Sequence, residues 1–172
     1  MRLGQRGFSM MEVTLSVMLV GLVLAAALNT VAGAKAATVQ QDQRAVGGAL
    51  CESLMSEVLS QQYADSDEGR ASFGLRSGEE GIGFRALFDD VDDYDGWSAS
   101  PPQEKDGSSL NWAGGYERTV TVTCVRPGDY AKVTPDGVAL KKITVVASLA
   151  GRPVYTLEAY ASPLWPDPRE QP

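Results

Sequence analysis

The stretch that decides the fold is Arg6-Gly7-Phe8-Ser9-Met10-Met11-Glu12, which opens an uncharged run from Val13 to Ala34. The run has 22 residues, and at about 1.5 Å of rise per residue a helix of this length is about 33 Å long. That length is enough to cross the hydrocarbon core of a bilayer. The run therefore predicts a membrane span.

A secretory signal peptide is the main alternative for this run. Arg2 and Arg6 form a basic region before it, and the small residues at 32–36 offer a cleavage site. However, the run is longer than the apolar core of a signal peptide, which has about 7 to 15 residues, and Glu12 stands at its start. Both features favour the membrane span.

Glu12 needs a cationic partner, because an unpaired carboxylate at the start of a membrane span is costly. If the chain is cut after Gly7, the new α-amino group of Phe8 lies about one helical turn from Glu12. We expect these two charges to pair, either within one chain or between neighbouring chains.

The motif Arg6-Gly7-Phe8-Ser9-x-x-Glu12, followed by an apolar helix, resembles the processing site of type IV prepilins and type II secretion pseudopilins. The resemblance implies that a prepilin peptidase cuts after Gly7 and methylates Phe8, and that Glu12 pairs with the new terminus during assembly. The chain departs from the family in two respects. Met10-Met11 replaces the commoner aliphatic pair, and the first proline is Pro101, so the helix-bending proline of many pilins is absent.

Composition limits the other function classes. A chain of 172 residues allows one modest globular domain besides the helix. The formal charge of −7 argues against nucleic acid as a partner. The sequence has no histidine, which removes the commonest general base and metal ligand. We therefore do not expect an enzyme.

Two cysteines, Cys51 and Cys124, leave two interpretations open. The basic leader predicts a cytoplasmic N-terminus, so the C-terminal part would lie in an oxidising compartment where a disulfide is stable. Such a bridge would close a loop of about 73 residues and stabilise the fold by roughly 4 kcal/mol. The alternative is that both cysteines are small buried apolar residues.

The helix is expected to continue as an amphipathic half over residues 35–62. Its apolar residues recur at helical spacing, at Val39, Val46, Leu50, Leu54 and Val58. Gly47-Gly48 interrupts this half. The pair marks either a flexible point or a close approach between the helix and a strand, and the second interpretation is favoured.

Residues 63–115 form a predicted variable loop region that contains an acidic segment. Five carboxylates fall within seven residues, at Asp89, Asp90, Asp92, Asp93 and Asp95. Oxygen ligands at this density suit Ca²⁺. The favoured interpretation is a solvated, turn-forming loop, and a calcium site is the alternative.

The C-terminal part predicts an antiparallel sheet over residues 116–161. Alternation of apolar and polar residues indicates strands at 116–126, 141–150 and 153–161. A short strand near 130–133 and a turn at 134–137 are also expected. The tail, 162–172, is rich in proline and does not continue the sheet.

The predicted order is a leader (1–7), a transmembrane or filament-core helix (8–34), its amphipathic half (35–62), the loop region and the sheet. This is an α+β chain with a long helix on a C-terminal sheet, the arrangement that type IV pilins share. Three segments also resemble MshD-type minor pilins of the mannose-sensitive haemagglutinin pilus: 52–59, 89–97 and 141–145.

The resemblance implies a minor pilin or pseudopilin, a structural subunit of a type IV pilus or a type II secretion filament. Its partners would be the prepilin peptidase, other pilins and an inner-membrane assembly platform. It would begin as a single-pass inner-membrane protein with a periplasmic domain and end in the filament. The alternative is a membrane-tethered or secreted periplasmic binding module that uses the acidic segment for Ca²⁺ or another cationic ligand.

Overall fold

The computed structural model describes residues 9–64, 73, 85–134 and 139–163. Its elements are one helix, α1 (Met10–Leu59), and four strands. The strands are β1 (Ser98–Ala99), β2 (Tyr116–Val125), β3 (Leu140–Leu149) and β4 (Arg152–Ala161), and three short 3₁₀ helices are η1 (Arg85–Leu87), η2 (Asp92–Tyr94) and η3 (Asn111–Ala113). The predicted α+β class, with a long N-terminal helix and a C-terminal antiparallel sheet, is confirmed.

Helix α1 runs without interruption through two compact units, which divide after Asp42. In the first unit every described side chain of α1 is exposed, including the long apolar ones. The hydroxyl groups there bond to the carbonyls of their own helix: Thr14 to Met11 at 2.9 Å, Ser16 to Glu12 at 2.7 Å, and Thr30 to Ala26 at 2.9 Å. By length and composition, α1 is able to cross a membrane.

In the second unit α1 buries one face against the sheet. The buried residues recur at helical spacing and are Gly47, Gly48, Leu50, Cys51, Leu54, Met55 and Val58. The predicted stripe is therefore correct from Leu50 onward, whereas Val46 is half-buried and Val39 is exposed. The helix ends at Leu59 rather than at residue 62.

Gly47 lies where α1 comes closest to the sheet. A Cβ atom at this position would be 2.8 Å from Val154 Cγ2 and 3.1 Å from Tyr155 Cβ, and at Gly48 it would be 3.4 Å from the Tyr155 ring. Distances under 3 Å leave no room for a side chain. The close-approach interpretation of the glycine pair is therefore confirmed.

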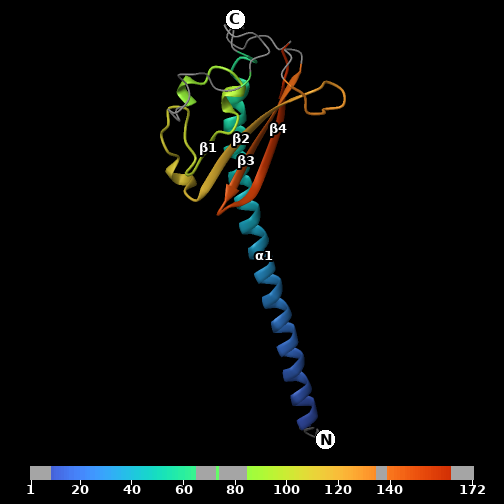
Figure 1. Ribbon diagram of the computed structural model, residues 1–172. Helices are drawn as coiled ribbons and strands as arrows, with labels where there is room; N and C mark the ends of the chain where they lie inside the picture. Colours follow the sequence, from blue (N-terminus) through green and yellow to red (C-terminus); the bar gives the residue numbers. More distant parts are fainter. Residues whose placement is uncertain (1–8, 65–72, 74–84, 135–138, 164–172) are drawn as a thin grey trace, which may run out of the picture. The chain divides into compact units, whose positions relative to one another are not determined.

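The sheet has the order β1-β2-β3-β4 with antiparallel neighbours (Figure 1). Val120 pairs with Val145, and Val145 pairs with Leu157. These residues, and those that share their face of the sheet, are buried or half-buried. The residues between them, on the opposite face, are mostly more exposed, as the sequence alternation predicted. The core joins this face to α1 and to residues 88–99.

Two further details depart from prediction, and two other predictions are not tested. The two residues of β1 fall in an expected loop. Residues 130–133 form no strand, although Val125 and Lys132 make an isolated bridge. The predicted turn at 134–137 lies outside the described residues except for Thr134, as do residues 164–172 of the tail.

Candidate functional site

The first candidate site is the N-terminal turn of α1. Ser9 caps the helix, because its Oγ accepts a hydrogen bond from the Glu12 amide at 3.2 Å and its carbonyl accepts from the amides of Glu12 (3.0 Å) and Val13 (3.2 Å). Ser-x-x-Glu at a helix start is the capping-box pattern, so the spacing of Ser9 and Glu12 could have predicted this cap. Glu12 takes part in this cap through its backbone amide. Gly7 and Phe8 lie outside the described residues, so the pairing of Glu12 with a terminal amine stays a prediction.

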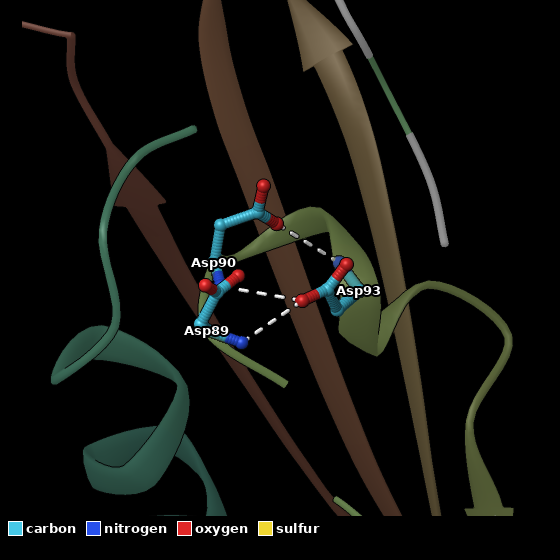
Figure 2. Close-up of side chains that lie close together, drawn as sticks. All are labelled: Asp89, Asp90 and Asp93. Atoms are coloured by element: carbon cyan, nitrogen blue, oxygen red, sulfur yellow. Dashed lines mark hydrogen bonds between the residues drawn. The ribbon is translucent and has the colours of Figure 1, made fainter. Parts of the chain in front are cut away.

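The second candidate site is the acidic segment, which folds on itself. Asp93 Oδ2 accepts hydrogen bonds from the amides of Asp89 (3.0 Å) and Asp90 (3.3 Å). Asp90 Oδ1 accepts from the amides of Asp92 (2.9 Å) and Asp93 (3.1 Å). Figure 2 shows the carboxyl groups of Asp90 and Asp93 turned towards each other's backbone. These bonds fix the turn that leads into η2, because they bind amides that the short helix leaves without partners.

Three of the five predicted calcium ligands come together in this turn. Carboxylate oxygens of Asp89, Asp90 and Asp93 lie within 4.8 Å of one another. The other two are used elsewhere: Asp92 pairs with Lys141, and Asp95 Oδ1 accepts a hydrogen bond from the Val122 amide at 2.8 Å. The calcium site stays a prediction.

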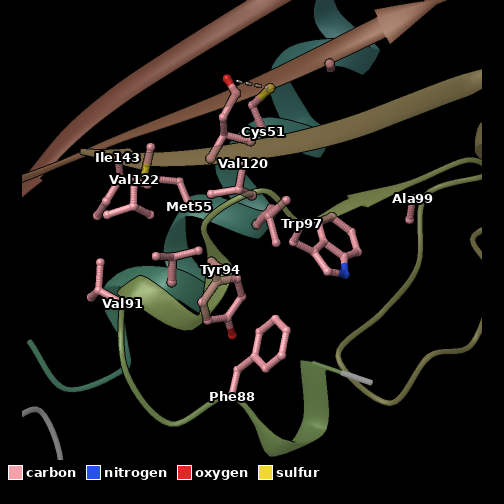
Figure 3. Close-up of a cluster of buried hydrophobic side chains, with 14 residues drawn as sticks. Cys51, Met55, Phe88, Val91, Tyr94, Trp97, Ala99, Val120, Val122 and Ile143 are labelled. Atoms are coloured by element: carbon pink, nitrogen blue, oxygen red, sulfur yellow. Dashed lines mark hydrogen bonds between the residues drawn. The ribbon is translucent and has the colours of Figure 1, made fainter. Parts of the chain in front are cut away.

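The expected turn is confirmed, but its expected solvation is wrong for three of the five carboxylates, since only Asp89 and Asp95 are exposed. The exposed fractions of Asp90, Asp92 and Asp93 are only 6%, 2% and 3%. Tyr94 is fully buried, and its ring meets that of Phe88 edge to face at 5.0 Å between centroids. Figure 3 shows this pair in the apolar cluster beside Val91 and Trp97. The segment is part of the core because its carboxylates have buried partners, which a count of charges does not show.

Burial changes the protonation of Asp90. Its pKa is raised to about 7, first by desolvation, then by the charge of the Asp92 carboxylate and a hydrogen bond with it, and further by Asp93. The Lys141 charge opposes this rise. Asp90 therefore keeps a proton to much higher pH than an exposed aspartate.

Lys141 is the cation of this site, and the sequence interpretation missed it. It is 1% exposed, forms an ion pair with Asp92 and donates a hydrogen bond to the Tyr63 carbonyl. Its Nζ lies 4.4 Å from the centre of the Tyr63 ring and 5.9 Å from that of Phe73. The signal was available, because the alternation of Ile143 and Val145 places Lys141 on the core face of β3.

A second buried polar cluster lies around Trp97. Arg85 and Arg118 are 2% and 1% exposed, and both donate to the Gln103 carbonyl. Arg85 Nε is 3.0 Å from Glu57 Oε1, and its guanidinium carbon lies 4.2 Å from the centre of the Trp97 ring.

This cluster links α1 to the sheet and to the acidic segment. Arg118 Nη1 donates to the Leu50 carbonyl at 3.2 Å, and Tyr94 donates to Glu57 Oε1 at 3.0 Å. Burial, followed by the neighbouring Arg85 charge, lowers the pKa of Arg118 to about 10. Alternation with Val120 places Arg118 on the core face of β2, so the sequence carried a signal for it as well.

The disulfide alternative for the cysteines is corrected by the structure. Cys51 and Cys124 are both buried and are not bridged. Cys51 Sγ is 3.7 Å from the Val145 carbonyl, whereas Cys124 pairs with Lys141, four residues along β3. Four residues of strand span about 13 Å, which is beyond the reach of a disulfide. Burial raises the pKa of Cys51 to about 11.

In comparisons with protein-family models, curated proteins and solved structures, nothing matches this chain.

Proposed function

We propose that the chain is a minor pilin or pseudopilin, a structural subunit assembled through the first half of α1. The observation that carries the proposal is the contrast between composition and exposure in this half. Val13 to Ala34 is uncharged, yet every side chain from Met10 to Asp42 is exposed. An apolar surface of this length requires a bilayer or other helices to cover it.

The first half of α1 also suits close helix packing. Gly21 and Gly33 have nothing within 4 Å of an added Cβ, so their small surfaces are available to another helix. Small residues let helix backbones approach closely in an apolar environment. In the proposed assembly, neighbouring pilin helices replace lipid around this half.

The residues before α1 supply the processing signal in this proposal. The leader stays in the cytoplasm, a prepilin peptidase cuts between Gly7 and Phe8, and Phe8 is methylated. The globular unit lies in the periplasm. Glu12 offers its charge to the Phe8 amine of a neighbouring subunit, which sets the register as the helix leaves the inner membrane through the assembly platform.

The first test is the N-terminal mass of the full chain, purified from membranes of cells with and without a prepilin peptidase. A peptidase-dependent start at methylated Phe8 supports the proposal. A start within residues 33–37 in both strains would contradict it, because that result is signal-peptide cleavage.

A second test separates the charge of Glu12 from its place in the helix cap. Glu12→Gln keeps a side chain that is able to cap the helix but removes the charge, whereas Ser9→Ala removes the hydroxyl cap and keeps the charge. The pairing predicts that Glu12→Gln is cleaved normally but enters filaments poorly, and that Ser9→Ala still assembles. The opposite pattern would assign Glu12 to helix capping alone.

A further inference from the structure

We propose that Lys141 and Asp92 form an intramolecular amide bond between Nζ and Cγ, with the Asp90 carboxyl group as the proton carrier. The inference concerns the globular unit alone and does not depend on the assembly proposed above.

The first argument is the contact between the two reacting groups. Lys141 projects from the core face of β3, Asp92 from η2, and Nζ donates directly to Asp92 Oδ1. Two groups fixed in this way react with effective molarities of up to about 10⁵–10⁸ M. Such a value favours a condensation that does not proceed between free amines and acids in water.

The second argument is the surroundings of the pair. The side chains of Lys141 and Asp92 are 1% and 3% exposed, and the Tyr63 and Phe73 rings lie near Nζ. Holding two charges out of water is costly. The product amide has no buried charge, so desolvation favours it over the ion pair.

The third argument is the presence and fixed position of Asp90. Its carboxyl group is hydrogen-bonded to that of Asp92, and the amides of Asp92 and Asp93 hold its Oδ1 at 2.9 and 3.1 Å. It is 6% exposed, so it is buried together with the reacting pair. Asp90 is therefore able to give and take protons beside the Asp92 carbonyl carbon.

The reaction balances without any other reagent. A proton passes from the Lys141 ammonium to the Asp92 carboxylate, and the amine nitrogen then attacks Asp92 Cγ. Asp90 gives its proton to the former carbonyl oxygen and takes one from the nitrogen. It then protonates the departing hydroxyl, the C–O bond breaks and water leaves. The last proton returns from the new amide to Asp90, so one ammonium and one carboxylate become one amide and one water.

The test is mass spectrometry of the full chain after purification and unfolding. We expect most chains to be lighter than their sequence by one water molecule. Trypsin does not cut after an amidated lysine, so residues 86–105 should appear joined to residues 133–142. Both peptides lie outside the leader, so the result is independent of N-terminal processing.

Four variants make the test specific. Lys141→Met should show no joined peptide. Asp92→Asn should release ammonia in place of water and give the same joined peptide as the wild-type chain. Asp90→Asn keeps an acceptor for the two amides but carries no exchangeable acid proton, so linkage should be about 100-fold slower. Asp89→Asn, which changes the exposed neighbour, should link as the wild-type chain does.

A folded wild-type chain that has its full mass and is cut after Lys141 would overturn the proposal, and the pair would then be an ion pair only. Circular dichroism of the same sample establishes that it is folded, so this decisive measurement does not depend on any variant folding. A joined peptide in Lys141→Met, or full linkage in Asp90→Asn, would overturn the assigned roles.

Discussion

The two halves of α1 belong to one unbroken helix but have opposite relations to the rest of their chain. From Met10 to Asp42 every side chain is exposed, although the run from Val13 to Ala34 is apolar. From Gly47 to Val58 the helix has a buried face that packs on the sheet of its own unit. Helix formation is thus common to both halves. What differs is whether the apolar partner is encoded in the same chain.

The glycines and glutamates show the difference residue by residue. Gly21 has open space around it, whereas Gly47 has no room for a Cβ atom. Glu12 is exposed at the helix start, whereas Glu57 pairs with a buried arginine. A glycine or a glutamate therefore has different contacts in each half, so a substitution in one half is a control for the same substitution in the other.

The largest effect is expected from Glu57→Ala. This change leaves Arg85 and Arg118 buried without the carboxylate that pairs with Arg85 and accepts from Tyr94. Removing one partner of a buried charge pair lowers the free energy of unfolding by about 3–5 kcal/mol. Urea unfolding of the globular unit, followed by tryptophan fluorescence, measures the loss. Glu12→Ala should leave that transition unchanged, and an equal loss in both variants would refute the contrast.

Gly47→Ala is expected to have the next largest effect. The new methyl group would meet Val154 and Tyr155 at 2.8 and 3.1 Å. Overpacking of this kind lowers the free energy of unfolding by about 1–3 kcal/mol. Gly21→Ala is the matched control, because the added methyl group meets nothing there and alanine favours the helix by about 1 kcal/mol. A Gly47→Ala chain as stable as wild type would mean that the contact is not tight.

A change of pH is expected to have a smaller effect on the free energy of unfolding, through Asp90 in the globular unit. The pKa of Asp90 is about 7 in the folded chain, whereas its usual value is 3.8. At a pH between these two values Asp90 keeps its proton in the folded chain and releases it in the unfolded chain. The folded state then binds more protons, so the contribution of Asp90 to stability falls as pH rises from about 4 to 7. Burial is the largest cause of this shift, and in a chain whose Asp92 and Lys141 are not joined, the charges of Asp92 and Asp93 add to it while that of Lys141 opposes it.

Asp90→Asn isolates this contribution, because asparagine does not titrate. The urea midpoint of the wild-type chain should fall relative to that of the variant between pH 4 and pH 7. A constant difference between the two chains over this range would show that Asp90 titrates as an ordinary aspartate.

The smallest effect is expected for the reactivity of Cys51. Its thiol is buried, and its raised pKa of about 11 leaves little thiolate at neutral pH. We expect no alkylation of Cys51 by iodoacetamide in the folded chain and full alkylation in urea, both measured by peptide mass. Ala36→Cys places a thiol in the exposed half of α1 and should react at once in the native protein.

Much of the fold was predictable because the patterns are long. Apolar residues recur along the whole uncharged run, and core-facing and outward-facing residues alternate along the ten residues of β2, β3 and β4. The two residues of β1 contain no such repetition, and their pairing with Arg118 and Thr119 comes from the neighbouring strand. The cysteines illustrate another limit. The sequence is consistent with two buried cysteines, but it does not show that Cys51 lies at Val145 and Cys124 at Lys141, four residues apart on β3.

The site was less predictable because burial of a charge depends on its partner. The sequence showed five aspartates, but only the fold joins Asp92 to Lys141 and turns Asp90 and Asp93 onto nearby amides. Alternation placed Lys141 and Arg118 on core faces, yet their charge argued for solvent. The spacing of Ser9 and Glu12 is also typical of a helix cap. Because both residues belong to the processing motif, the sequence interpretation assigned them to processing and did not predict the cap.

The hydroxyl groups of α1 have a consequence for any change of surroundings. Thr14, Ser16 and Thr30 each donate to a carbonyl one turn earlier, so none of them requires lipid headgroups, water or a second helix as a partner. If this half leaves a bilayer for a bundle of like helices, these side-chain hydrogen bonds remain intact. The transfer then exchanges one set of dispersion contacts for another and is close to reversible. Only Glu12, at the edge of the run, would give that transfer a direction.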